Sequence, residues 1–212
     1  VDGPLFVFTH GAGAAANSDF MNTIALGLAS AGIRVARFNF DYMQQRLETG
    51  SRRPPERAPK LITQFAARVA EFNQPMVIGG KSMGGRMASL LMAEMIEQNI
   101  SKEPVPFNDK IKGVACLGFP FHPSNKPESL RTEHFQQIQV PVFIAQGERD
   151  KLGNKAEVAT YTLNDALELL WLEDGDHDLK PRVKSGFNHQ AHLETTIKTM
   201  AQFIKTSLTE SE

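Results

Sequence analysis

The stretch MVIGGKSMGGRMASLL, residues Met76–Leu91, decides how the rest of the chain is interpreted. It begins as an apolar strand, passes through a sharp turn with Ser82 at its apex, and continues with residues of helical character. Gly80 and Gly84 lie two residues before and two after Ser82, which fits the pattern G-x-S-x-G in its required strand–turn–helix context. A larger side chain at either position would collide in so tight a turn. We therefore predict that Ser82 is a nucleophile, the alternative being a glycine-rich turn that only lets the helix pack closely.

Composition predicts one compact, soluble domain spanning residues 1–212. The chain has 212 residues and a net charge of −1, a balance that argues against nucleic acid or a membrane surface as a partner. No apolar run approaches the roughly 18 residues that a membrane span needs. The single cysteine, Cys116, lies in an apolar run where a small buried side chain is expected, and it cannot form an intrachain disulfide, so we expect a cytoplasmic location. Nothing in the sequence fixes the oligomeric state.

Apolar runs alternate with stretches of helical character along the whole chain. This rhythm predicts an α/β fold with a mainly parallel sheet of about six strands, helices on both faces and no cap domain. Ligand sites of such sheets lie beyond the carboxyl ends of the strands. Besides the strand that starts at Met76, the expected strands are Leu5–Thr9, Ile33–Phe40, Gly113–Gly118, Val142–Gln146 and Ala166–Leu172. Besides the helix after Ser82, which should run to about Gln98, the expected helices are Asp19–Ala31, Leu61–Asn73, Lys155–Leu163 and His189–Ile204.

Three stretches are expected to be irregular. Asp41–Lys60 contains several arginines and three prolines, which oppose a continuing helix, so it should be a solvated loop or a cationic flap over the site. Ser101–Asn108, with two prolines, should be a loop. Gly118–Ser129 lies where a lid could be inserted, but the gap is too short to hold one, and the site should be fairly open.

Two further residues complete a catalytic set with Ser82. Serine-based hydrolysis needs a base to accept the hydroxyl proton and an acid to orient that base. Asp150 follows the fifth predicted strand and His177 the sixth, in the chain order Ser, Asp, His. His122, which follows the fourth strand, is the main rival for the role of base.

The developing oxyanion also needs donors, and backbone N–H groups are the candidates. We expect them at Met83, the first residue after the nucleophile, and at Ala12, in the glycine and alanine cluster after the first strand. His10 opens that cluster and should support it by hydrogen bonding. His10, His122 and Arg149 are also candidates for substrate contact.

Charged residues close to this set suggest two further possibilities. Cations flank it in sequence and could favour an anionic substrate, although such charges more often form a solvated rim; they are Lys81, Arg86, Arg149, Lys151, Lys180 and Arg182. The acidic cluster Asp174–Asp178 could be imagined as a metal site, but its residues lack the spread of structural zinc ligands. We expect no metal and no cofactor.

Five motifs together carry a resemblance to a known family; they are His10–Gly13, Arg37–Phe40, Gly80–Arg86, Gln146–Asp150 and Gly175–Pro181. Through them the chain resembles the α/β-hydrolase superfamily over nearly its whole length. More narrowly it is similar to the small, lidless branch related to dienelactone-hydrolase-like proteins and to the KANL3/Tex30-type hydrolase-like domain. The superfamily usually has extra antiparallel strands before the first strand seen here, so these strands are absent or were cut away. Dienelactone hydrolases proper use cysteine where this chain has Ser82, so their reaction is not carried over.

The sequence thus predicts a serine hydrolase that cleaves a carboxylic ester or a related acyl bond of a small soluble substrate through an acyl-enzyme. Two alternatives stay open at this point. The first is a hydrolase-like interaction module that binds partners without turnover. The second is a serine peptidase acting on short peptides with the same three residues.

Overall fold

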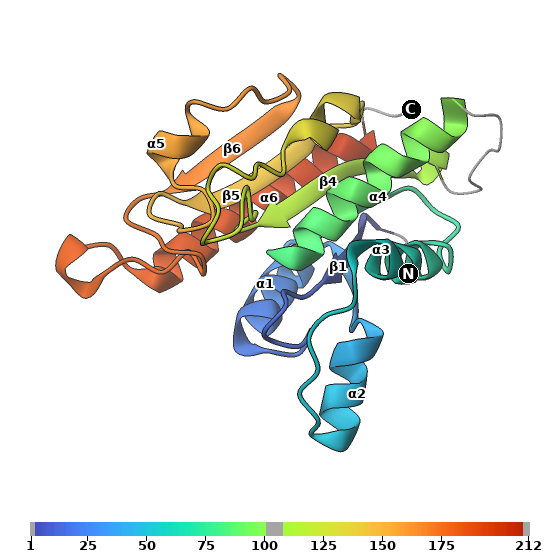
Figure 1. Ribbon diagram of the computed structural model, residues 1–212, viewed down its shortest axis with the longest axis horizontal. Coiled ribbons are helices and arrows are strands. Elements are labelled where there is room, and N and C mark those ends of the chain that lie inside the picture. Colours follow the sequence, from blue (N-terminus) through green and yellow to red (C-terminus); the bar gives the residue numbers. More distant parts are fainter. Residues whose placement is uncertain (1–2, 101–107, 210–212) are drawn as a thin grey trace.

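The computed structural model describes residues 3–100 and 108–209. Its centre is one six-stranded parallel sheet in the order β2-β1-β3-β4-β5-β6 (Figure 1). The four inner strands are almost entirely buried, since helices cover both of their faces. The strands are β1 Leu5–Thr9, β2 Arg34–Phe38, β3 Met76–Lys81, β4 Ile111–Leu117, β5 Val142–Gly147 and β6 Leu167–Leu172. The predicted parallel sheet is confirmed.

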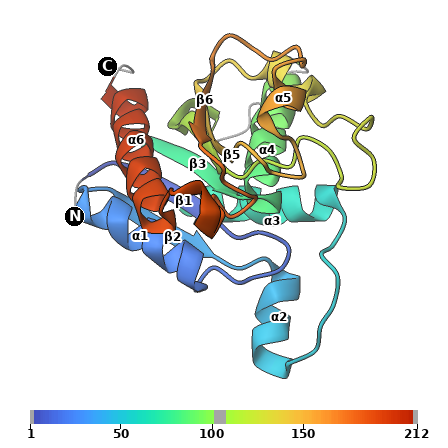
Figure 2. The same cartoon turned by 90° about the vertical axis from the view of Figure 1, so that its left-hand side faces the viewer.

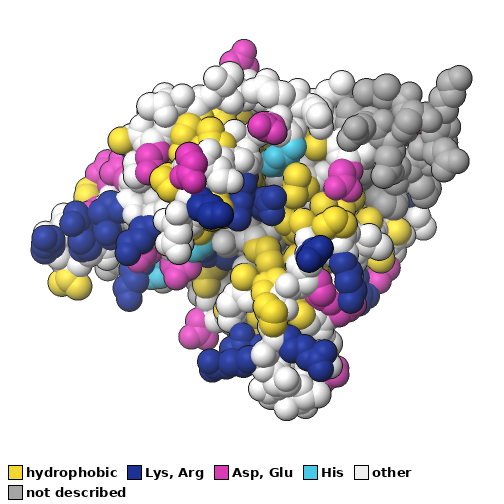
Figure 3. All heavy atoms as spheres, viewed as in Figure 1, with side chains coloured by type: hydrophobic (Ala, Val, Ile, Leu, Met, Phe, Trp, Pro, Cys, Tyr) yellow, Lys and Arg dark blue, Asp and Glu magenta, His cyan; other side chains and the backbone are white. Residues whose placement is uncertain are grey.

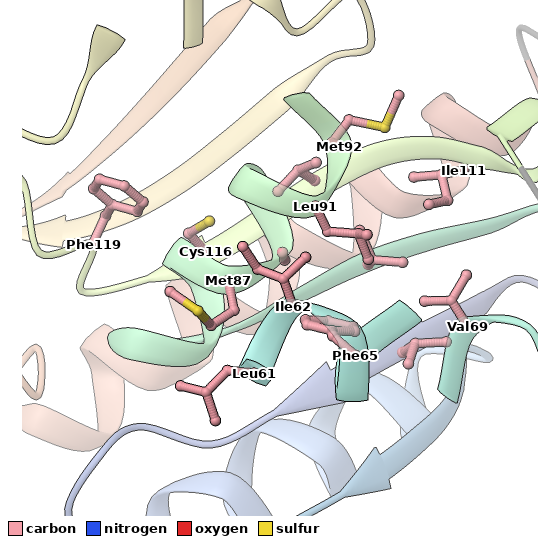
Figure 4. Close-up of a cluster of buried hydrophobic side chains, with 14 of the residues drawn as sticks. Leu61, Ile62, Phe65, Val69, Met87, Leu91, Met92, Ile111, Cys116 and Phe119 are labelled. Atoms are coloured by element: carbon pink, nitrogen blue, oxygen red, sulfur yellow. The ribbon is translucent and has the colours of Figure 1, made fainter. Parts of the chain in front are cut away.

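Helices lie on both faces of this sheet. α1 (Asp19–Ser30) and α6 (His189–Thr209) lie side by side on one face, and α3 (Ala58–Val69) and α4 (Met83–Ile100) cover the other (Figure 2). Each face has its own apolar core. Figure 4 shows the core under α3 and α4, where Phe65 and Met87 come from facing helices. No helix among residues 3–100 and 108–209 is long and apolar enough to cross a membrane.

The strand order creates a switch point between β1 and β3. The chain leaves β1 for the edge strand β2 and then returns to β3 on the other side of β1. Thr9 is paired with Gly80 in register, so the segments that follow β1 and β3 emerge side by side. A crevice outside the carboxyl ends of the strands forms at such a point. The predicted nucleophile at Ser82 lies directly beside it.

The turn after β3 depends on close contact between strand and helix. A Cβ atom added to Gly80 would lie 2.5 Å from the carbonyl carbon of Gly84 and 2.7 Å from the nitrogen of Gly85. Both are backbone atoms, so the start of α4 would have to move.

We expect Gly80→Ala to destabilise the fold by about 3 kcal/mol, because backbone atoms cannot rotate away from the added methyl group. Thermal unfolding should then begin roughly 10 °C lower. Gly13→Ala is the matched control, since an added Cβ there meets nothing within 4 Å. Equal melting temperatures for the two variants would contradict the close approach.

The prediction that Asp41–Lys60 is irregular is wrong for its first half. Residues Asp41–Thr49 form a helix, α2, which ends at Gly50 in the left-handed conformation. Its Tyr42 and Met43 are buried. The prolines that argued against a helix all lie beyond Gly50, and Pro59 lies in the first turn of α3, where it does not break the helix. In both ribbon views α2 projects from the body of the molecule (Figures 1 and 2).

Smaller differences concern element ends. The α3 helix starts and ends earlier than predicted, and α6 extends to Thr209. The helix predicted at Lys155–Leu163 is a single turn, α5 (Lys155–Val158), which a capping box begins at Asn154. Of the predicted loop 101–108, residues 101–107 lie outside the described residues. The described residues also form three short 3₁₀ helices: η1 Asn108–Lys110, η2 Glu133–Gln137 and η3 Val183–Ser185.

Candidate active site

Ser82 occupies a strained turn between β3 and α4. Its φ angle is 51°, in the left-handed region that few residues other than glycine adopt. The turn is held because the Ser82 N–H donates to the Leu117 carbonyl (2.8 Å) and the Arg86 N–H donates to the Ser82 carbonyl (3.1 Å). This geometry lifts the hydroxyl above the end of the sheet.

The structure brings the three predicted catalytic residues into one chain of hydrogen bonds. Ser82 Oγ lies 2.8 Å from His177 Nε2, and His177 Nδ1 lies 2.7 Å from Asp150 Oδ2. The three residues follow β3, β6 and β5, whose carboxyl ends share one edge of the sheet. Asp150 is fully buried, whereas the His177 side chain is 31% exposed. The ring can therefore reach both the buried carboxylate and a molecule arriving from solvent.

Asp150 is positioned by a residue that the sequence interpretation missed. Gln146, buried in β5, donates from Nε2 to Asp150 Oδ2 (2.9 Å), and the Leu152 N–H donates to Oδ1 (2.8 Å). The amide of Gln146 also bonds both backbone groups of Phe119. A polar residue inside an apolar strand, four positions before a predicted catalytic carboxylate, is the signal that could have identified it.

Hydrogen bonds made by His10 and by side chains of α2 hold the loop after β1, residues 10–18. The Phe40 N–H donates to His10 Nε2 (3.1 Å), so His10 Nδ1 carries the proton and donates to the Gly11 carbonyl (2.7 Å). The Tyr42 hydroxyl donates to the Ala12 carbonyl (3.1 Å). Arg46, also in α2, donates to the carbonyl of Gly13, at 3.2 Å. The helix missed from sequence thus supports the predicted oxyanion loop.

His10 should make the fold sensitive to mild acid. Burial lowers the pKa of His10 below 6.5, and the bond to Gly11 opposes this shift less strongly. The unfolded chain therefore binds a proton at this residue first, and the stability it contributes is lost as the pH falls below about 6.5. We expect His10→Gln to show a shallower loss of stability between pH 7 and pH 5.5 in urea unfolding. Parallel stability curves for the two proteins would contradict this role.

The two predicted oxyanion donors, Met83 and Ala12, belong to the start of α4 and to the wall of a cavity. Met83 is the first residue of α4, where backbone N–H groups have no partner within the helix. Ala12 lines a cavity of about 350 Å³ that also includes Ser82 and His177. Residues on its other walls come from the loop 10–18, from the start of α1, from the end of β3 and from the segment after β6; they are Gly11, Gly13, Ala14, Ser18, Phe20, Met21, Lys81 and Asp178.

Lys81 connects this cavity to the histidine segment. Its ammonium group donates to the His177 carbonyl (2.8 Å), lies 3.2 Å from an Asp178 oxygen, and stands over the Phe20 ring. Burial lowers the pKa of Lys81, and the Asp178 carboxylate partly offsets this effect. Lys81 thus ties the segment that carries His177 to the end of β3.

Three residues predicted to contact substrate lie away from this cavity. His10 is buried with both ring nitrogens occupied. His122 is also buried, with Nδ1 2.9 Å from the Pro123 carbonyl and Nε2 3.4 Å from Glu157. Arg149 donates to the backbone carbonyl of Asp174 and pairs with its carboxylate, both at 2.9 Å. Their side chains bond to neighbouring backbone and carboxylate groups, so we do not propose that these residues contact the substrate.

The acidic cluster at Asp174–Asp178 has structural partners. Asp174 binds Arg182 and Arg149, and Asp176 accepts the N–H groups of Asp178 and Lys180. Hydrogen bonding from Arg182 is the main cause of the low pKa of Asp174. Within the described ranges 3–100 and 108–209, no group of three or more His, Cys, Asp or Glu residues could hold a metal ion.

Solved structures with the same fold include several hydrolases. Est1E from Butyrivibrio proteoclasticus matches with a TM-score of 0.65 at 14% identity, over 95% of this chain and 88% of that one. Dienelactone hydrolase from Anabaena variabilis matches with a TM-score of 0.64 at 18% identity, over 97% and 87%. An alpha-beta serine hydrolase homologue from Coxiella burnetii matches with a TM-score of 0.64 at 14% identity, over 94% and 83%. At these identities the likeness is one of fold, and the narrower KANL3/Tex30-type resemblance stays a prediction.

A family model described as an alpha/beta hydrolase domain matches residues 2–205, which is nearly the whole chain. The matched range contains all six strands of the parallel sheet and the strained turn at Ser82. The chain therefore belongs to the alpha/beta hydrolase family.

Proposed function

We propose that this protein is a serine hydrolase that cleaves a carboxylic ester or a related acyl bond of a small substrate. The observation that supports this proposal best is the hydrogen-bonded chain from Ser82 Oγ through His177 to Asp150, with distances of 2.8 and 2.7 Å. The adjoining cavity of about 350 Å³ suits a small molecule. Structures of the same fold that are named as a dienelactone hydrolase and a serine hydrolase homologue agree with this reaction class.

In the first half of the proposed reaction, Ser82 Oγ attacks the carbonyl carbon of the substrate. His177 Nε2 accepts the hydroxyl proton as the new C–O bond forms. The negative charge on the carbonyl oxygen is held by the backbone N–H groups of Met83 and Ala12. As the tetrahedral intermediate collapses, the bond to the alcohol breaks and His177 returns the proton to the departing oxygen. The acyl group is then bound to Ser82.

In the second half, water replaces the alcohol. His177 takes a proton from the water, the resulting oxygen nucleophile attacks the acyl carbon, and Ser82 leaves with the proton restored. Asp150 keeps the Nδ1 proton of His177 in place and stabilises the imidazolium that forms in both halves. Gln146 holds Asp150 in the orientation that this task needs.

The direct test combines an activity-based probe with a small panel of esters. A fluorophosphonate should label the folded protein, and Ser82→Ala should abolish the labelling. Phenyl acetate and longer phenyl esters then report turnover, and short peptides test for peptidase activity. A folded wild-type protein that reacts with neither probe nor esters would favour an interaction module instead.

A further inference from the structure

Arg86 is a partly buried cation with no counter-charge among the described residues. It lies in the first turn of α4, and the part of the chain that the structure describes offers no hydrogen-bond partner to its buried Nε atom. Among residues 3–100 and 108–209, no carboxylate forms an ion pair with it. Burial lowers the pKa of Arg86, and the nearby charge of Arg131 lowers it further. Unsatisfied buried groups are rare in native proteins and require an explanation.

Arg131 adds a second unpaired cation at the same place. Its backbone N–H donates to the Phe121 carbonyl (2.8 Å), which fixes it in the segment that crosses from β4 to β5. Burial also lowers the pKa of Arg131, and no acidic partner is found for it among the described residues. Figure 3 shows Lys and Arg side chains near the centre of the face that is turned toward the viewer, with a histidine beside them. Two like charges thus lie near each other with no neutralising group among residues 3–100 and 108–209.

His134 is a third polar residue next to Arg86, and it carries no charge at neutral pH. Burial, with a smaller contribution from Arg86, lowers the pKa of His134 to about 4. Its Nε2 lies 2.8 Å from Ser89 Oγ, and that hydroxyl donates to the Arg86 carbonyl (3.0 Å). His134 therefore fixes the backbone of α4 beneath the arginines and leaves their positive charge uncompensated.

The other cations near the catalytic residues are occupied. Lys81 is bonded to the His177 carbonyl and to Asp178. Arg149 and Arg182 both bind Asp174. Arg86 differs from these cations, because no carboxylate among the described residues binds it.

Arg86 is close enough to Ser82 for one small molecule to span both. Ser82 directly precedes α4, and the Arg86 N–H donates to the Ser82 carbonyl (3.1 Å), so the two residues are one helical turn apart. Side chains on a helix tilt toward its N-terminus, which is the end of α4 that follows Ser82. The partial positive charge at the start of α4 also favours an anion there.

We propose that Arg86 and Arg131 together bind a carboxylate or phosphate group carried by the substrate, so that the protein prefers anionic esters. This inference rests on the proposed hydrolase function and names the substrate class of that same site. Guanidinium groups suit the task because their paired N–H donors match the two oxygens of a carboxylate or phosphate. Binding would neutralise the charge that the fold leaves uncompensated.

The kinetic test compares two esters that differ only in a distal charge, phenyl acetate and para-carboxyphenyl acetate. For the wild type we expect kcat/KM to be higher for the charged ester, and this preference should weaken as salt is added. Arg86→Gln with Arg131→Gln should reduce the charged-to-neutral ratio of kcat/KM by about 10- to 100-fold, mainly through KM. Arg86→Lys should keep part of the preference for the charged ester, since lysine keeps the positive charge but lacks the paired N–H donors of a guanidinium.

The matched control removes two exposed cations from α6, with Lys198→Gln and Lys205→Gln. It changes the net charge by the same amount as the double arginine variant and should leave the ratio unchanged. If the double arginine variant does not fold, Arg131→Gln alone, outside the sheet and helices, carries the test. An unchanged ratio in folded arginine variants would overturn the proposal while leaving the hydrolase function intact.

A binding arm separates this proposal from the catalytic one. Ser82→Ala cannot turn over esters, but it should still bind benzoate or inorganic phosphate, with NMR shifts in the side chains around Arg86. The two anions report the carboxylate and phosphate alternatives separately. Arginine-dependent binding without esterase activity in the wild type would refute the proposed function and keep the anion site. No binding of either anion would overturn the anion site.

Discussion

Replacing Ser82 with alanine is expected to reduce ester hydrolysis by about 10⁶-fold and to abolish labelling by a fluorophosphonate. The variant keeps the turn and the binding cavity but has no oxygen to form the acyl-enzyme. The remaining rate should come only from oxyanion stabilisation and substrate binding. Measurement of kcat with phenyl acetate, together with intact-protein mass spectrometry after probe treatment, checks both parts.

Ser124→Ala is the matched control for this variant. Ser124 is exposed, and its hydroxyl lies 3.5 Å from the side-chain oxygen of the neighbouring Asn125. It should retain both labelling and turnover. If Ser82→Ala is still labelled, or hydrolyses esters at the wild-type rate, then the nucleophile is another residue and the proposed mechanism is wrong.

Asp150→Asn is expected to lower kcat by about 10⁴-fold with little change in the fold. Both oxygens of Asp150 accept hydrogen bonds, from His177 and Gln146 on one side and from the Leu152 N–H on the other. An asparagine that keeps the Leu152 bond turns its NH₂ group toward His177 Nδ1. The ring then carries its proton on Nε2, facing Ser82, and cannot accept the hydroxyl proton.

Asp165→Asn is the control for charge, because Asp165 is an exposed carboxylate in the turn before β6. It should leave kcat unchanged. Circular dichroism and thermal melting must show that Asp150→Asn is folded. A folded Asp150→Asn variant with the kcat of the wild type would mean that His177 is oriented by other groups.

Much of the sheet could be predicted because its inner strands are covered on both faces. Such strands are continuous apolar runs, and Leu5–Thr9 and Val142–Gln146 stand out in the sequence for that reason. Helix α2 could not be recognised in the same way. Its nine residues bury only Tyr42 and Met43, so its apolar pattern is weak, and the prolines beyond it made the whole stretch look irregular.

The catalytic candidates could be predicted from local sequence patterns, but the partners of the charged residues around them could not. A motif places Ser82 at a turn and Asp150 at a strand end, because each depends on a few neighbouring residues. Pairing between Arg149 and Asp174, 25 residues apart, depends on how two loops meet. The same holds for Arg131, whose closeness to Arg86 arises only when the segment after β4 folds against α4.

The sheet order also has a consequence for synthesis of the chain on the ribosome. The proposed nucleophile, Ser82, follows an inner strand, but the proposed base, His177, follows β6, the edge strand that is made last. A nascent chain that has formed β1 to β4 has the turn at Ser82 but not the proposed base. Hydrolytic competence should therefore appear late in translation, when the final strand has joined the sheet.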